Sequence, residues 1–387
     1  DEYPTKIENP KVTLSYSYVD GIIGKTIGKD TIKNICNNLE MTVVGETDDA
    51  LELEIPAYRV DVQRPCDVVE DILRIYGYNN VEIPTQLKSC LVVKDAEDQK
   101  HKMENIIGEQ LVGCGFNEIL CNSLTKGAYY ADANAYPGHN SVRIMNPLSS
   151  DLNVMRQSLV FGGLESVEHN VKRKMANLRF FEFGNVYHFD PERQNDENPM
   201  AAYTEDYHLG LWLTGKRVEG SWAHADEEAT FFELEAYVEN ILRRIGLLPG
   251  MQVRKKSDND IFSAGIRVEN RGGKLLLEMG IISKKLLKAM DIDQPVFYAE
   301  LSWNALMKAV RKNVVQYTEI AKYPAVSRDL ARLVDNSVEF AQIEQVARET
   351  EKKLLKAVTL FDVYEGKNLE EGKKSYAVSF VLQDDNQ

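Results

Sequence analysis

The sequence predicts an α+β protein built on antiparallel sheets and divided into three consecutive domains, at residues 1–90, 91–312 and 313–387. Three observations support this. A chain of 387 residues has room for two or three domains of about 150 residues each. Its strand-like segments are interspersed with helices in no regular strand–helix–strand order, which favours antiparallel over parallel sheets. A hydrophobic fraction of 43% is enough for ordinary buried cores.

The first predicted domain is a small α+β unit of winged-helix size. Residues 11–19 alternate like a strand, and residues 41–45 and 50–56 are typical of two more. Asp30 is expected to cap a helix whose apolar face is formed by Ile32, Ile35, Cys36 and Leu39. Residues 58–78 supply a second helix.

The second predicted domain contains most of the strands. Residues 101–116 and 228–246 have the apolar periodicity of helices. The polar stretch 190–206 holds two prolines and is expected to be a loop. The predicted strands are residues 117–124, 178–189, 207–215, 264–269, 275–282 and 295–301.

The third predicted domain has the element order β-α-β-β. The strands are predicted at residues 327–335, 355–366 and 373–383. Asn336 and Glu339 have the spacing of a helix cap and precede a helical segment. This order is the first two thirds of a ferredoxin-like fold, so we expect a truncated domain that lacks its last helix and strand.

Composition excludes several classes of protein. No run approaches the roughly 18 apolar residues of a membrane span, and no signal-like start is present, so a cytoplasmic protein is expected. Five cysteines without C-x-x-C spacing favour neither a disulfide framework nor a zinc site. A net charge of −14 repels nucleic acid, which argues against DNA binding and restricts RNA contacts to a local patch. The first residue is Asp, so we expect a fragment or processed chain.

Four carboxylates lie in the stretch YRVDVQRPCDVVEDILRIYGY, and they have two readings. Asp67 and Glu70 have the spacing of a capping box at the start of a helix. Asp67, Glu70 and Asp71 also project from one helical face, and Asp61 from the preceding strand end can join them. Oxygen ligands in that number suit Mg²⁺. The residues alone favour the cap, and the two readings are compatible.

Three longer motifs carry a resemblance to a known family. YRVDVQRPCDVVEDILRIYGYNNVEIP is similar to the small domain before the synthetase-like module of bacterial phenylalanyl-tRNA synthetase beta subunits. MNPLSSDLNVMRQSL and LRFFEFGNVYHF resemble the class II synthetase-like module itself. YPAVSRDLARLVD and LFDVYEGKNLEEGKKSYAVSFVLQ resemble the C-terminal anticodon-binding domain. The resemblance covers nearly the whole chain, in family order.

The resemblance implies a non-catalytic part of a ligase that attaches phenylalanine to its tRNA with ATP. This part scaffolds the alpha subunit in a heterotetramer of two alpha and two beta chains, and it binds phenylalanine tRNA. The family also implies Mg²⁺ on Asp61, Asp67, Glu70 and Asp71, shared with the alpha subunit. The alternative is a stand-alone RNA- or protein-binding module without a ligase partner.

The central domain lacks the residues that adenylate formation needs. Class II synthetases hold the ATP phosphates with arginines, because negative charge builds up at phosphorus. Arg179 and Glu182 are separated by two residues instead of the one in the catalytic motif, so they are expected on opposite strand faces. Residues 295–310 have neither a glycine-rich run nor an arginine. We therefore predict no catalytic residues here and no activity of the fragment alone.

Candidate RNA contacts lie in the last domain. Arg328, Lys373 and Lys374 can meet phosphates, and Tyr376 and Phe380 can stack on bases if they lie on the open face of the sheet. Lysines after a hairpin turn also serve solubility, and alternation places Tyr376 and Phe380 together on one face that can equally be the inner one.

Overall fold

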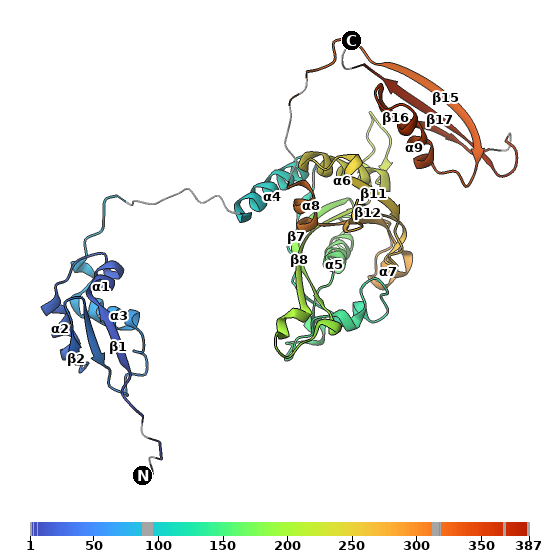
Figure 1. Cartoon of the computed structure of the whole chain (residues 1–387). Helices are drawn as coiled ribbons and strands as arrows, with labels where there is room; N and C mark the ends of the chain where they lie inside the picture. Colours follow the sequence, from blue (N-terminus) through green and yellow to red (C-terminus); the bar gives the residue numbers. More distant parts are fainter. Residues whose placement is uncertain are drawn as a thin grey trace. The chain divides into compact units, whose positions relative to one another are not determined.

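The computed structural model describes residues 7–86, 96–311, 319–366 and 369–384, together with residues 2, 4, 5 and 317. The chain forms two compact units, Asp1–Lys94 and Asp95–Gln387 (Figure 1). The predicted domain boundaries near residues 90 and 312 lie outside the described residues. Helices and antiparallel strands occur in both units, so the predicted α+β class is confirmed.

The first unit is a three-stranded antiparallel sheet with three α-helices. The strand order is β1 (Lys11–Ser15), β3 (Ala50–Glu54), β2 (Thr42–Glu46). The helices are α1 (Tyr16–Ile23), α2 (Lys29–Asn38) and α3 (Pro65–Tyr76), followed by the short turn η1 (Tyr78–Asn80). Their common core contains Leu14, Val19, Ile32, Leu51, Val68 and Ile72.

Two local predictions for this unit are wrong. The first strand ends at Ser15, because the Ser15 hydroxyl accepts a hydrogen bond from the Tyr18 amide at 3.2 Å and starts α1. The second helix is capped at Gly28, so Asp30 lies in its first turn. A carboxylate there still interacts favourably with the helix dipole.

The central part of the second unit is a seven-stranded sheet. Its strands pair in the order β11-β12-β13-β14-β8-β7-β4, and every pair is antiparallel except β4 with β7. The bounds are β4 (Asn117–Glu118), β7 (Leu178–Phe189), β8 (Tyr203–Thr214), β11 (Gln252–Lys256), β12 (Phe262–Asn270), β13 (Leu275–Ile282) and β14 (Val296–Ser302). The short pairs are β5 (Leu124–Thr125) with β6 (Val154–Met155), and β9 (Lys216–Val218) with β10 (Glu227–Glu228). Single 3₁₀ turns are η2 (Gly127–Tyr130), η3 (Gly138–Asn140), η4 (Ser150–Leu152), η5 (Pro191–Arg193), η6 (Pro199–Ala202) and η7 (Pro249–Met251).

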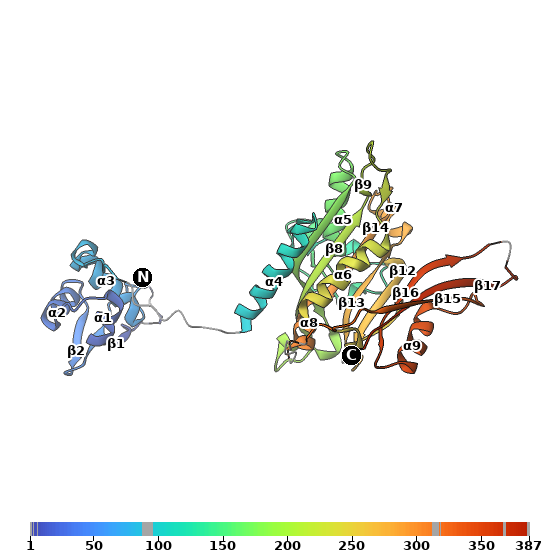
Figure 2. The ribbon, with the colours of Figure 1, turned by 90° about the horizontal axis from the view of Figure 1, so that it is seen from above.

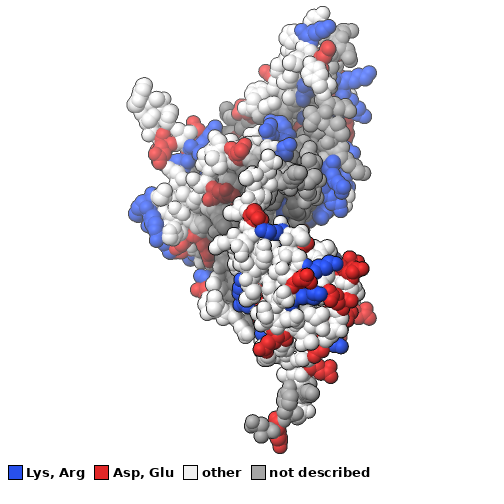
Figure 3. Space-filling model, turned by 90° about the vertical axis from the view of Figure 1, so that its left-hand side faces the viewer, with Lys and Arg blue, Asp and Glu red and all other residues white. Residues whose placement is uncertain are grey.

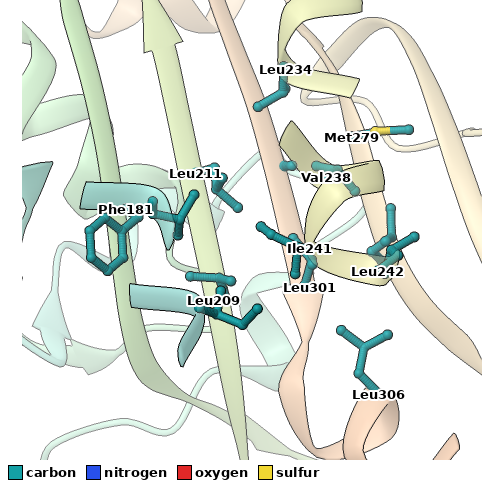
Figure 4. Close-up of a cluster of buried hydrophobic side chains, with 14 of the residues drawn as sticks. Phe181, Leu209, Leu211, Leu234, Val238, Ile241, Leu242, Met279, Leu301 and Leu306 are labelled. Atoms are coloured by element: carbon teal, nitrogen blue, oxygen red, sulfur yellow. The ribbon is translucent and has the colours of Figure 1, made fainter. Parts of the chain in front are cut away.

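Each face of this sheet packs on its own apolar core. On one face, α4 (Ala96–Gly113), α6 (Phe231–Ile245) and α8 (Trp303–Val310) contribute to the first core. Figure 4 shows Leu209, Leu211 and Leu301 of this core beside Val238 and Ile241 of α6. On the other face, α5 (Val160–Val171) and α7 (Lys284–Ala289) contribute to a second core around Trp212 and Tyr298.

The predicted loop at residues 190–206 is partly a strand. The β7–β8 pairing extends over twelve residues, from Leu178 opposite Thr214 to Phe189 opposite Tyr203. Strand β8 therefore begins at Tyr203, and only the segment with η5 and η6 remains irregular. Phe189 packs on Tyr203 with ring centroids 5.2 Å apart, and this cross-strand pair stabilises the early start.

The described C-terminal residues form the expected β-α-β-β order. The elements are β15 (Val326–Asp335), α9 (Phe340–Thr350), β16 (Leu355–Tyr364) and β17 (Lys373–Leu382). Strand β17 is central and pairs antiparallel with both others, and α9 lies along one side of this sheet (Figure 2). The helix is capped by Glu339 with Gln342, not by Asn336 with Glu339. The prediction was three residues too early because both pairs have capping-box spacing.

Candidate functional site

Three of the four acidic residues near α3, Asp61, Asp67 and Asp71, are paired with arginines of the same stretch. Asp71 is buried, and its two oxygens accept hydrogen bonds from Arg59 Nη2 at 2.6 Å and Arg74 Nη2 at 2.7 Å. Asp61 is paired with the same Arg59 at 3.2 Å. The Arg59 hydrogen bond lowers the pKa of the Asp61 carboxyl. Two guanidinium groups therefore neutralise these two carboxylates.

Asp67 lies at the start of the helix, but at the third helical position and not at the N-cap position that the predicted capping box gave it. The helix begins at Pro65, so Arg64 is the N-cap residue and Asp67 is the third helical residue. One Asp67 oxygen accepts from the backbone amides of Gln63 at 3.1 Å and Arg64 at 2.9 Å. The Arg64 side chain and these amides hold the pKa of Asp67 well below its usual range. Glu70, the predicted second half of the capping box, is exposed instead.

The carboxylates do not converge on one point. Among the described residues, no group of three or more His, Cys, Asp or Glu side chains is placed to hold a metal ion. Both oxygens of Asp71 already have cationic partners. In this arrangement Asp71 is bound by arginines and Asp67 binds amides at the helix start, and the assignment of Mg²⁺ to these residues stays a prediction.

Two of the three candidate RNA contacts have partners within the last domain. Lys374 is buried; its ammonium donates to the Asn336 carbonyl at 2.9 Å and lies 4.8 Å from the centroid of the Tyr376 ring. Lys373 is paired with Asp335 at 2.7 Å. Arg328 lines an apolar groove of about 740 Å³ between α9 and the sheet.

Tyr376 and Phe380 belong to the covered face of the sheet. Tyr376 is buried and packs edge-on against Phe340 of α9, with ring centroids 6.4 Å apart. Phe380 lines the same groove as Val346 of α9. Both rings therefore lie on the face that α9 covers, and the Tyr376 ring is buried there, whereas Phe380 is half-buried.

Arg179 and Glu182 lie on opposite faces of β7, as their spacing predicts. Arg179 reaches toward Glu233 of α6 at 3.4 Å. Glu182 is fully buried on the other face, where Arg156 Nη1 binds its Oε1 at 2.7 Å. Arg156 is also buried and donates through Nε to the Asn185 carbonyl at 2.8 Å. Both arginines are thus bound to carboxylates of this chain.

A row of mostly polar residues crosses the face of the sheet that carries Glu182. Sequence patterns do not reveal this row. Residues directly opposite each other on neighbouring strands share a face. Across β11, β12, β13, β14, β8 and β7, the row reads Lys255, Arg267, Glu278, Glu300, Gly210 and Glu182. The only available signal was the isolated acidic residue in each of two apolar strands, LLLEMGII and VFYAELS.

Models of three protein families match the chain in succession. The tRNA synthetase B5 domain matches residues 12–78, the phenylalanyl tRNA synthetase beta chain CLM domain residues 83–303, and the ferredoxin-fold anticodon binding domain residues 321–387. Acidic and basic side chains both occur on the face shown in Figure 3. No helix in the described part of the chain is long and apolar enough to cross a membrane.

Curated relatives with high identity carry one name. The phenylalanine–tRNA ligase beta subunit of Bacteroides fragilis strain YCH46 is 60% identical over 97% of this chain and 46% of its own length. The same subunit of Porphyromonas gingivalis is 47% identical over 100% of this chain and 47% of its own. The chain thus spans about half the length of these relatives. A solved pyrrolysyl-tRNA synthetase from Desulfitobacterium hafniense aligns with a TM-score of 0.40 at 14% identity, covering 54% of this chain and 68% of that one. The central match alone covers more than half of the residues, and the chain therefore belongs to the family of phenylalanyl-tRNA synthetase beta chains.

Proposed function

We propose that this chain is the non-catalytic part of a phenylalanine–tRNA ligase beta subunit. In the cytoplasm, it scaffolds the alpha subunit in an assembly of two alpha and two beta chains. It also contributes to binding phenylalanine tRNA. The complete assembly uses ATP and Mg²⁺ to activate phenylalanine. The observation that carries this proposal is the succession of the three family matches in one chain.

The central sheet supports the non-catalytic role. Arg156 and Arg179 are bound to Glu182 and Glu233, so neither guanidinium is free to hold a triphosphate. Trp212 fills the sheet face beside α5: a Cβ added to Gly163 would lie 2.0 Å from the indole ring. The adenylate is then made on the alpha subunit.

Exposed apolar residues in the loops of the central part support docking of a partner. Leu120, Met145 and Leu148 are 89%, 90% and 94% exposed. Exposed apolar side chains that lie close together mark protein–protein interfaces, and Met145 and Leu148 are three residues apart in one loop. Met145 and Leu148 belong to the motif MNPLSS and are candidates for the contact with the alpha subunit.

Co-expression with the alpha subunit of the same organism tests the proposal. We expect a stable complex on size-exclusion chromatography, and no phenylalanine-dependent ATP–pyrophosphate exchange by this chain alone. Leu148→Asp is expected to weaken the complex, whereas Leu248→Asp, at another exposed leucine of the central part, leaves it intact. Exchange activity of the purified chain, or failure to form any complex, contradicts the proposal; the latter favours a stand-alone binding module.

The tRNA contacts in the last domain are a separate part of the proposal. Lys373 and Arg328 remain the proposed phosphate contacts, because neither side chain is buried. Lys374 contributes by holding the Asn336 carbonyl beside the helix start, not by a free ammonium group.

The proposed Mg²⁺ on Asp61, Asp67, Glu70 and Asp71 would require Asp71 to exchange its arginine partners for the ion. We expect Asp71→Asn to lower the free energy of unfolding of the first unit by about 1–3 kcal/mol, because the buried position loses two charge-assisted hydrogen bonds. Urea unfolding with and without about 10 mM MgCl₂ measures this loss of free energy. Equal losses in both conditions support the arginine-bound state. A loss seen only with MgCl₂ shows that the isolated chain already binds the ion there. Asp48→Asn, at an exposed position of the first unit outside the proposed ligands, is the matched control.

A further inference from the structure

A cavity of about 680 Å³ lies against the polar row of the central sheet. Glu278 of β13 and Glu300 of β14 stand side by side in its floor, because the two residues pair directly. We propose that this cavity binds a small organic molecule with a primary ammonium group and an aromatic body. Nothing in the ligase role described above uses these residues.

The walls of the cavity are fixed by hydrogen bonds, so the site is pre-formed. Residues 134–137 line one side of the cavity, and the two oxygens of Asp260 accept from the backbone amides of Asn134 and Ala135 at 2.9 Å. Gln157 Nε2 donates to the Pro137 carbonyl at 3.1 Å and so fixes the same segment. A pre-formed concave site binds small molecules without an ordering cost.

The charge of the lining favours a cation. Four carboxylates, those of Asp258, Glu269, Glu278 and Glu300, face three permanent cations, Lys255, Lys256 and Arg267. Lys255 and Arg267 both bind Glu269 at 2.7 Å. Both cations are therefore engaged by Glu269, and Arg267 comes no closer than 3.9 Å to Glu278.

Glu300 and Glu278 differ in their capacity for a ligand. Glu300 accepts from Ser158 Oγ, Tyr298 Oη at 2.7 Å and His208 Nδ1 at 2.7 Å, so its oxygens are occupied. Glu278 accepts only from the neutral Ser257 at 2.8 Å and Asn259 at 3.0 Å, and Arg267 is 3.9 Å away. Each carboxylate oxygen accepts about two hydrogen bonds. Glu278 is therefore the group that can accept from an ammonium ion.

The remaining lining suits an aromatic body. Tyr136, Phe262 and Tyr298 line the cavity, and the rings of Phe262 and Tyr298 have centroids 6.4 Å apart. His188 also lines it. Burial lowers the pKa of His188, and the ring nitrogens of an uncharged imidazole offer one donor and one acceptor.

The test uses the full chain and three probes of similar size and shape that differ in charge: phenethylamine (a cation), 2-phenylethanol (neutral) and phenylacetate (an anion). Isothermal titration calorimetry at pH 7.5 is expected to give phenethylamine a Kd of about 1 mM or tighter. The alcohol should bind about tenfold more weakly or worse, because it lacks the charge. Equal binding of the alcohol, binding of the anion, or no binding of the amine overturns the proposal.

A variant pair assigns the binding to this cavity. Glu278→Gln keeps the size of the side chain and is expected to weaken phenethylamine binding about tenfold or more. Glu235→Gln, on α6 at the other face of the sheet, should leave the affinity unchanged. Thermal melts establish that each variant folds. If Glu278→Gln does not fold, His188→Ala takes its place. Unchanged affinity in the folded Glu278→Gln chain, or in His188→Ala, overturns the assignment.

Discussion

Replacing Arg156 by methionine is expected to lower the free energy of unfolding of the central part by about 3–5 kcal/mol. Arg156 is 4% exposed and its guanidinium binds Glu182, which is 0% exposed. Methionine removes the cation and leaves a carboxylate in an apolar core, where its remaining strong donor is the Cys121 amide at 3.2 Å. An uncompensated buried charge is one of the few single changes with an effect of this size.

The measurement is urea unfolding followed by tryptophan fluorescence. Trp212, Trp222 and Trp303 account for all the tryptophans and lie in the central part, so the signal reports on this region alone. The double variant Arg156→Met with Glu182→Met should be more stable than Arg156→Met, because no charge remains buried. A single variant within about 1 kcal/mol of the parent would show that Glu182 does not depend on Arg156.

Replacing Trp212 by alanine is expected to cost about 3–5 kcal/mol in the same measurement. The indole is fully buried and packs on Tyr298 with ring centroids 5.1 Å apart. It also occupies the space that a side chain at Gly163 or Gly210 would need. The two glycines allow the helix and the neighbouring strand position to approach the ring, so its loss leaves a cavity that the backbone cannot easily close.

A substitution on α5 provides the control. In the parent chain, Gly163→Ala places a methyl group against the indole and should destabilise by about 1–3 kcal/mol. In the Trp212→Ala background the same substitution should be neutral or stabilising, because the clash is gone and part of the cavity is filled. Additive losses in the double variant would contradict the packing of Trp212 on Gly163. Trp212→Phe, which keeps an aromatic ring, should cost less than Trp212→Ala.

Much of the fold is predictable from the sequence because it depends on local patterns. Period-two alternation places Tyr376, Val378 and Phe380 on one face of a strand, and the structure confirms it. The motif-based family assignment is confirmed as well, because long motifs in a fixed order leave few alternatives. Helix starts are less certain: several Ser, Asp, Asn and Glu residues near each start can cap, and the choice depends on tertiary packing.

The candidate site is less predictable for two reasons. The pairs Asp67–Arg64 and Asp71–Arg74 have helical i,i+3 spacing, so the sequence does contain the signal that arginines occupy these carboxylates. By contrast, Glu278 meets Glu300 and Arg156 meets Glu182 only because distant strands and loops pair in one register. A shift of one residue would send these side chains to the other face, and a single sequence does not specify the register.

Strand β14 lies between β13 and β8 in the sheet, although it follows both in the chain. While the ribosome is still making residues before Val296, the edges of β8 and β13 that later pair with β14 therefore have no neighbour in the nascent polypeptide. Open edges invite pairing with other molecules. The sheet can close only after Ser302 has emerged, so a nascent chain stalled or cleaved before that residue is exposed to aggregation.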